Sequence, residues 1–139
     1  MKQKFVNLYM EIASSVSKLS SAKRLQVGAI VVKDDRVISM GYNGTPSGWD
    51  NTCEEEINGV LVTKPEVLHA ETNALAKLAK SSESGDNASL FITHAPCMNC
   101  AKLIYQAGIK HVYYKQDYRD TSGKEFLKKL GVYVEEVNG

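Results

Sequence analysis

The feature that most constrains this chain is a pair of cysteines, Cys97 and Cys100, in the motif P-C-M-N-C at residues 96–100. Residues three apart lie on the same face of a helix, so a helix that begins at this motif presents both sulfurs on one side. His69, on a second predicted helix, can supply a third ligand to a zinc ion, which leaves the fourth tetrahedral position open for water. Glu71 is then placed to move protons and not to bind the metal.

Composition predicts one compact domain. The chain has 139 residues, 43% of them hydrophobic, which suits a single core over residues 1–139. Seventeen basic and sixteen acidic residues give a formal net charge of +1, so no global field attracts nucleic acid or membrane surfaces. No apolar run approaches the ~18 residues of a membrane span, and residues 1–19 are amphipathic, unlike a signal peptide. We therefore expect a soluble, cytoplasmic protein.

Hydrophobic periodicity predicts a helix and then a hairpin in the first half. A helical stripe over residues 5–19 is expected to bury Phe5, Leu8, Tyr9, Ile12, Val16 and Leu19. Apolar segments at 27–32 and 37–40, joined by a turn at Asp34 and Asp35, predict an antiparallel hairpin. Residues 41–68 show no sustained hydrophobic periodicity, so we expect an irregular connection. A connection of this length in a small domain more often has a function than none.

The second half alternates helices with strands. We expect helices from residue 69 to about 80, from 97 to 107, and up to Gly131, with strands at 90–93, 112–114 and 132–137. Strands joined through helices are parallel, so the fold class is α/β, a mixed five-stranded sheet with helices on both faces. Both halves of the metal motif then lie at helix N-termini, where the helix dipole favours thiolate at Cys97 and Cys100.

The two motifs, H-x-E at 69–71 and P-C-x-x-C at 96–100, together match the known signature of zinc-dependent nucleobase deaminases. Zinc lowers the pKa of its bound water toward ~7, which supplies a nucleophile at neutral pH. Glu71 would take the proton of that water, deliver it to N3 of a cytosine ring and then protonate the departing amine. The predicted chemistry is hydrolytic deamination.

Other interpretations of the metal-ligating side chains stay open. A structural zinc closed by His94, His111 or Cys53 is possible, although Glu71 favours catalysis. His94 receives no role, and His111 is expected to be structural. Three cysteines, two of them in C-x-x-C, favour metal binding over disulfides. Cys53 is expected to be a small buried side chain, with a second metal site that includes His94 as the alternative.

Further segments extend the match beyond the metal motif. They are Q-V-G-A at 26–29, G-Y-N-G-T-P-S-G at 41–48 and V-L-H-A-E at 67–71. With these the chain resembles the deoxycytidylate (dCMP) deaminases of bacteria, animals and large phages, over most of its length from about residue 20. The resemblance implies a cytidine-deaminase-like three-layer fold, conversion of dCMP to dUMP and ammonia with catalytic Zn²⁺, and a homohexamer.

The resemblance also implies roles for residues around the substrate. Asn43 matches an asparagine that contacts the sugar hydroxyl, and a left-handed turn residue before Gly44 is the alternative. The candidates for phosphate and ring contacts are Arg24, Tyr118 and Arg119, and Ala70 is assigned to the substrate site with them. Solvated surface charge is the alternative for both arginines.

Regulation by triphosphates is the last implication of the resemblance, with dCTP as activator and dTTP as inhibitor. The candidate site is the glycine-rich block, Gly41, Tyr42, Gly44 and Gly48, with Mg²⁺ on the triphosphate. A purely structural glycine-rich turn is the alternative.

Other functional classes compete with this interpretation. A deaminase could act on dCTP, on free cytidine or deoxycytidine, or on a nucleic-acid base. The near-neutral charge and the single tryptophan, Trp49, argue against nucleic acid as a partner. A non-catalytic zinc module is the third class, and the intact Glu71 argues against it. We expect small nucleotides as partners, with neither nucleic acid nor membrane.

Overall fold

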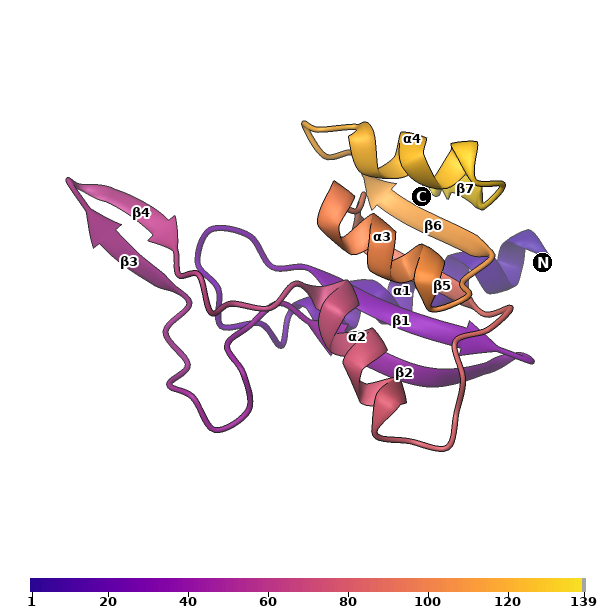
Figure 1. Ribbon diagram of the computed structural model, residues 1–139, viewed down its shortest axis with the longest axis horizontal. Coiled ribbons are helices and arrows are strands. Elements are labelled where there is room, and N and C mark those ends of the chain that lie inside the picture. The colour runs from indigo at the N-terminus through magenta and orange to yellow at the C-terminus, as the bar shows by residue number, and fades with distance from the viewer. Residues whose placement is uncertain (139) are drawn as a thin grey trace.

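The computed structural model describes residues 1–138 and has a mixed five-stranded sheet at its centre (Figure 1). The strands lie in the order β2-β1-β5-β6-β7. β1 (Gly28–Lys33) pairs antiparallel with β2 (Arg36–Tyr42) and with β5 (Ser89–His94). β5, β6 (His111–Gln116) and β7 (Tyr133–Glu136) run parallel. The predicted mixed five-stranded sheet is confirmed.

One face of the sheet is covered by α1 (Gln3–Ser17), which lies behind it in Figure 1. This layer is built around aromatic rings. Phe91 stacks on Tyr113 with 4.6 Å between ring centroids, and Tyr9 of α1 packs on Phe91 at 5.4 Å. Burial of such large side chains contributes strongly to the stability of a core.

The opposite face is covered by α2 (Ala70–Ala79), α3 (Met98–Gln106) and α4 (Ser122–Lys129). Small residues such as Ala74 and Ala101 are fully buried there, which lets these helices approach the sheet and each other closely. The predicted helices on both faces are confirmed. Among residues 1–138, no helix combines the length and the apolarity needed to cross a membrane.

Two glycines allow α1 and α2 to approach the β1–β2 hairpin from opposite faces. A Cβ added at Gly28 would lie 2.2 Å from the carbonyl oxygen of Ala13 in α1. One added at Gly41 would lie 2.5 Å from the carbonyl oxygen of Ala70 in α2. Side-chain carbons do not approach backbone atoms so closely, so close packing accounts for glycine at both positions.

The buried face of α1 differs from the predicted stripe. The residues that it buries are Val6, Tyr9, Met10, Ala13 and Val16. Phe5, Leu8 and Leu19 were expected in the core, but they are 38, 46 and 60% exposed. The prediction assigned the largest apolar side chains to the buried face. The helix instead packs on the sheet with the small Ala13, which lies against Gly28.

The connection between Gly41 and Leu68 contains a second, two-stranded sheet that was not predicted. β3 (Glu54–Ile57) and β4 (Val60–Thr63) form an antiparallel hairpin that projects from the domain (Figure 1). The expectation of an irregular segment is therefore wrong at residues 54–63. The turn is Asn58-Gly59, whose φ angles of 52° and 77° suit a two-residue hairpin turn.

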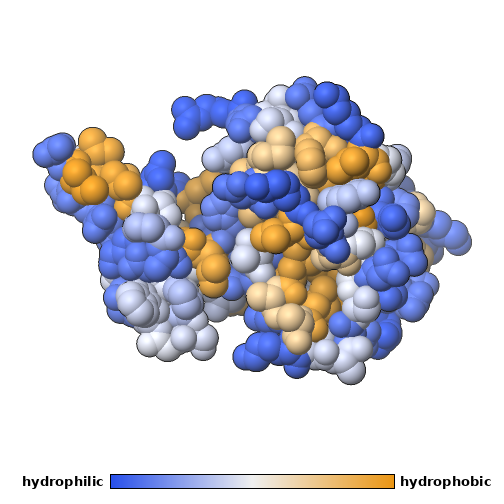
Figure 2. Space-filling view, in the orientation of Figure 1, coloured by the Kyte–Doolittle hydropathy of each residue, from blue (hydrophilic) through white to orange (hydrophobic). Residues whose placement is uncertain are grey.

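The outer part of this hairpin is exposed on both faces. Ile57, Val60, Leu61 and Val62 are 36 to 60% exposed. Figure 2 shows apolar side chains gathered on the projecting hairpin. Only the base of the hairpin is buried, at Cys53 and Glu54, and this base faces the site described next.

Candidate active site

Three metal-ligating side chains converge at the N-termini of two helices. His69 is the N-cap of α2, Cys97 is the N-cap of α3, and Cys100 lies in the first turn of α3. Their donor atoms all lie within 4.8 Å of one another. The imidazole Nδ1 is 3.2 Å from Sγ of Cys100 and 3.6 Å from Sγ of Cys97, so both sulfurs share it. The structure brings the predicted ligands together at the predicted helix N-termini.

One imidazole nitrogen and two thiol sulfurs in so small a space are a donor set that suits zinc. Within residues 1–138, no further His, Cys, Asp or Glu joins this group. His94, His111 and Cys53 therefore do not close a structural four-ligand site. The cluster fits zinc with three protein ligands.

Thiol protonation in this cluster is uneven. The hydrogen bond with Cys100, and to a smaller extent the one with His69, lowers the pKa of Cys97 to about 4. The hydrogen bond to Cys97 and burial raise the pKa of Cys100, and the hydrogen bond with Cys97 raises the pKa of His69. Of the two cysteines, Cys97 thus loses its proton more readily, and a metal cation that binds here would displace the protons of the cluster.

Two neighbours that the sequence analysis missed support the cysteines. The hydroxyl oxygen of Thr72 lies 3.7 Å from Sγ of Cys100, and hydrogen-bond donors of this kind orient metal ligands. Gly123, in α4, lies directly against the backbone that carries Cys97. A Cβ there would be 2.2 Å from the carbonyl oxygen of Pro96. Glycine at 123 therefore sets how closely α4 packs on the cysteine motif.

Glu71 is the buried carboxyl group of the site, with 4% of its surface exposed. Burial raises the pKa of Glu71 to about 7, although a hydrogen bond from its own backbone N–H and the nearby positive charge of His69 act in the opposite direction. A carboxyl group that titrates near neutral pH can both accept and donate a proton. This is the property that the predicted role requires.

A cavity of about 590 Å³ opens beside the cluster, within the size range of small-molecule sites. Besides His69, Glu71 and Cys97, it is lined by all the side chains predicted for the substrate: Arg24, Asn43, Ala70, Tyr118 and Arg119. The structure therefore brings the predicted catalytic and substrate residues around one space. The four residues predicted for regulation, Gly41, Tyr42, Gly44 and Gly48, do not line it.

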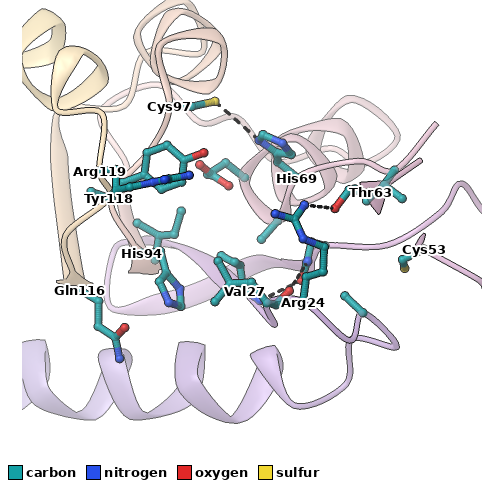
Figure 3. Close-up of a pocket in the computed structure, with 18 of the residues that line it drawn as sticks. Arg24, Val27, Cys53, Thr63, His69, His94, Cys97, Gln116, Tyr118 and Arg119 are labelled. Atoms are coloured by element: carbon teal, nitrogen blue, oxygen red, sulfur yellow. Dashed lines mark hydrogen bonds between the residues drawn. The ribbon is translucent and has the colours of Figure 1, made fainter. Parts of the chain in front are cut away.

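The two arginines enter the cavity from opposite sides in the view of Figure 3. Two of the carboxylates that line the same cavity are already engaged. Glu54 accepts hydrogen bonds from two backbone N–H groups, and Asp117 pairs with Lys124. Within residues 1–138, neither Arg24 nor Arg119 forms a salt bridge. Their positive charges are left available for an anion that enters the cavity.

Asn43 supports the cavity wall. Its side-chain oxygen accepts a hydrogen bond of 2.8 Å from the backbone N–H of Val27, and its side-chain nitrogen donates one of 2.7 Å to the carbonyl oxygen of Leu25. The alternative of a left-handed turn residue is wrong, because Asn43 is not among the residues with positive φ. Asn43 thus fixes the segment that leads from Arg24 into β1.

His94 and Cys53 also lie at the cavity. His94 received no role from the sequence, yet it lines the wall, with Nδ1 2.9 Å from the hydroxyl of Thr93. Burial lowers the pKa of His94, which favours its neutral form. Cys53 is buried as predicted, and its sulfur lies 3.5 Å from the hydroxyl of Ser21.

Comparison with known proteins agrees with this geometry. A family model described as the cytidine and deoxycytidylate deaminase zinc-binding region matches residues 3–116. The chain belongs to this deaminase family. The dCMP deaminase of cyanophage S-TIM5, solved in complex with dCMP and dUMP, is 51% identical over 99% of both chains, with a TM-score of 0.93. The predicted resemblance to dCMP deaminases and the cytidine-deaminase-like fold are confirmed.

Two curated relatives are longer than this chain. ComE operon protein 2 of Bacillus subtilis is 40% identical over 119 residues, and the deoxycytidylate deaminase of Schizosaccharomyces pombe is 35% identical over 140 residues. The chain aligns over 85 and 91% of its own length, but it spans only 63% of the first relative and 42% of the second.

Proposed function

We propose that this protein converts dCMP to dUMP and ammonia by zinc-dependent hydrolysis. The observation that carries the proposal is one cavity that combines two chemical features. The first is the cluster of His69, Cys97 and Cys100 with the buried Glu71, and the second is a pair of arginines, Arg24 and Arg119, that form no salt bridge within residues 1–138. A nucleotide with an exocyclic amine and a phosphate matches both features. The dCMP and dUMP complex of the cyanophage relative supports this substrate.

The metal cluster and Glu71 divide the chemistry between them. His69, Cys97 and Cys100 would hold the zinc ion, which when bound supplies a Lewis acid that makes water nucleophilic near neutral pH. Glu71 accepts a proton from the attacking water and passes it to N3 of cytosine as the C–O bond forms at C4. It then takes the second proton from the new C4 hydroxyl and gives it to the amine, so that the C–N bond breaks, ammonia leaves and the C4 carbonyl forms. Burial raises the pKa of Glu71 to about 7 in the zinc-free protein, and a bound cation would lower it from there.

The two arginines and their neighbours in the cavity bind the rest of the nucleotide. Arg24 and Arg119 make charge-assisted hydrogen bonds to the 5′-phosphate. Tyr118, which also lines the cavity, contacts the ring, and Asn43 contacts the sugar hydroxyl. Because the phosphate lies far from the bond that breaks, these contacts act mainly on substrate affinity.

We also propose that dCTP activates and dTTP inhibits the enzyme, as a Mg²⁺ complex bound at the block of residues 41–48, in a homohexamer. A backbone connection supports the coupling. Gly44 and Leu68 exchange two hydrogen bonds, of 3.1 and 2.7 Å, and Leu68 directly precedes His69. A ligand that moves Gly44 therefore acts on the backbone of a metal ligand. Sigmoidal dCMP kinetics that dCTP makes hyperbolic would support this regulation, and hyperbolic curves under all conditions would contradict it.

The proposed substrate is tested with two charge-removing variants. We expect kcat/KM of the wild type to be higher for dCMP than for deoxycytidine, cytidine or dCTP. Arg24→Gln and Arg119→Gln should each cost about 1.5 to 3 kcal/mol with dCMP, the range for a hydrogen bond to a charged group, and little with deoxycytidine. Arg36→Gln is the control, because Arg36 pairs with Glu83 outside the cavity. Equal losses on both substrates, or a wild type that prefers deoxycytidine, would contradict the proposal.

A further inference from the structure

The base of the β3–β4 hairpin differs from the rest of the hairpin. Glu54 and Thr63 face each other as register partners at this base, and both line the cavity. Glu54 is only 6% exposed, whereas the other residues of β3 and β4 are exposed. A buried carboxylate needs hydrogen-bond donors, so the partners of Glu54 indicate what this base does.

Both residues of this pair bind Arg24. One carboxylate oxygen of Glu54 accepts hydrogen bonds from the backbone N–H groups of Lys23, at 2.9 Å, and Arg24, at 3.0 Å. The hydroxyl oxygen of Thr63 accepts a hydrogen bond of 2.9 Å from Nη1 of the same arginine (Figure 3). One cross-strand pair therefore holds Arg24 at its backbone and at the end of its side chain.

Arg24 needs such support because of where it lies. It belongs to the segment between α1 and β1, which has no helix or strand of its own, and its side chain is exposed. An arginine side chain carries about 2 kcal/mol of rotamer entropy, which an anion must otherwise remove when it binds. A hydrogen bond that already fixes the guanidinium lowers this cost.

Other contacts join the same two segments. The hydroxyl of Ser21 donates a hydrogen bond of 2.8 Å to the carbonyl oxygen of Asn51, just before β3. The backbone N–H of Lys64 donates one of 2.8 Å to the carbonyl oxygen of Cys53, which closes the hairpin base. The base of the hairpin and the segment that carries Arg24 thus form one hydrogen-bonded unit, while the outer hairpin is left in solvent.

We propose that Glu54 and Thr63 are positioning residues that pre-organise Arg24 to bind the anionic group of the substrate. The β3–β4 hairpin then serves as the support of the anion subsite. This inference rests on the proposed function, because it takes the anion to be the phosphate of dCMP. It predicts that loosening the hairpin base weakens binding of a phosphate and leaves the chemical step unchanged.

Thr63→Val is the principal test, because it removes the hydroxyl and keeps the size and the β-branching of the side chain. We expect KM for dCMP to rise about 3- to 10-fold, which corresponds to the loss of one hydrogen bond, with kcat retained. KM for deoxycytidine, which has no phosphate, should not change. Inhibition by inorganic phosphate should weaken by a similar factor, and Thr63→Ser should restore both values.

Glu54→Ala tests the backbone side of the same unit and should shift KM for dCMP in the same direction. Glu56→Ala is its matched control, because Glu56 is an exposed glutamate of the same strand and does not line the cavity. A merely structural role of Glu54 would lower thermal stability and affect both substrates alike.

The proposal is overturned if Thr63→Val and Glu54→Ala leave KM for dCMP at the wild-type value, or if both substrates lose equally. A wild type that turns over no dCMP would contradict the proposed function instead. In that case calorimetric binding of inorganic phosphate decides the positioning role, since equal affinity in wild type and Thr63→Val would overturn it.

Discussion

Glu71→Gln is expected to stabilise the zinc-free protein at alkaline pH, although it strongly reduces the turnover of the zinc-loaded protein. Burial raises the pKa of Glu71 from its ordinary value of 4.5 to about 7. The unfolded chain therefore ionises first, so this group favours folding most below pH 4.5, and stability falls as the pH rises to about 7. At 1.36 kcal/mol for each pH unit, the loss above pH 7 amounts to about 3 kcal/mol. Glutamine does not ionise and avoids this loss.

Urea unfolding of chelator-treated wild type and Glu71→Gln, at pH 5 and pH 8, measures the effect. Chelation is required because a bound cation would itself favour the carboxylate. Groups that do not interact with Glu71 cancel between the two proteins, so we expect the wild type to lose about 2 to 3 kcal/mol more than the variant between the two pH values. The zinc-loaded variant should keep its zinc and lose activity by ~10² to 10⁴. The same pH dependence in both proteins would refute the burial argument, and loss of zinc would refute the proton-transfer role.

Further predictions concern the metal ligands and the glycines. Cys97→Ala should lower the zinc content measured by atomic absorption and reduce stability, because coordination energy is also folding energy, whereas Cys53→Ala should keep its zinc. Gly123→Ala should weaken zinc binding in a chelator competition, because its Cβ would lie 2.2 Å from the carbonyl oxygen of Pro96; unchanged zinc affinity would contradict the packing argument. Gly41→Ala should lower the free energy of unfolding by about 1 to 3 kcal/mol, because the new methyl group collides with α2, and an unchanged urea midpoint would count against this.

The metal cluster was predictable from the sequence because its geometry is local. The spacing of Cys97 and Cys100 fixes their shared helix face. Pro96 indicates the helix start at Cys97, and the leucines and alanines after His69 indicate the other helix. Only the contact between α2 and α3 had to be assumed, and the known signature supplied it. The alternation of helices and strands likewise predicted the sheet, since each segment has its own period.

The surroundings of Arg24 were harder to predict, because they depend on contacts between segments that are distant in the sequence. Glu54 stands in a run of three glutamates that reads as a solvated surface, and only the folded chain shows that one of them binds the backbone of Arg24. The hairpin itself has a local signal in the sequence, Asn58-Gly59 between apolar residues, that predicts a two-residue turn. The buried face of α1 depends on the close packing of Ala13 on Gly28, and the periodicity of apolar residues does not indicate this contact.

The central claim is that this cavity catalyses hydrolysis of the amine of dCMP, and isotopic labelling tests it most directly. Purified zinc-loaded protein is incubated with dCMP in H₂¹⁸O, and the nucleotide product and the ammonia are measured together. We predict that dUMP and ammonia form in equal amounts and that the new carbonyl oxygen at C4 carries the ¹⁸O label. An absence of dUMP, or dUMP without the label in its base, would contradict the account.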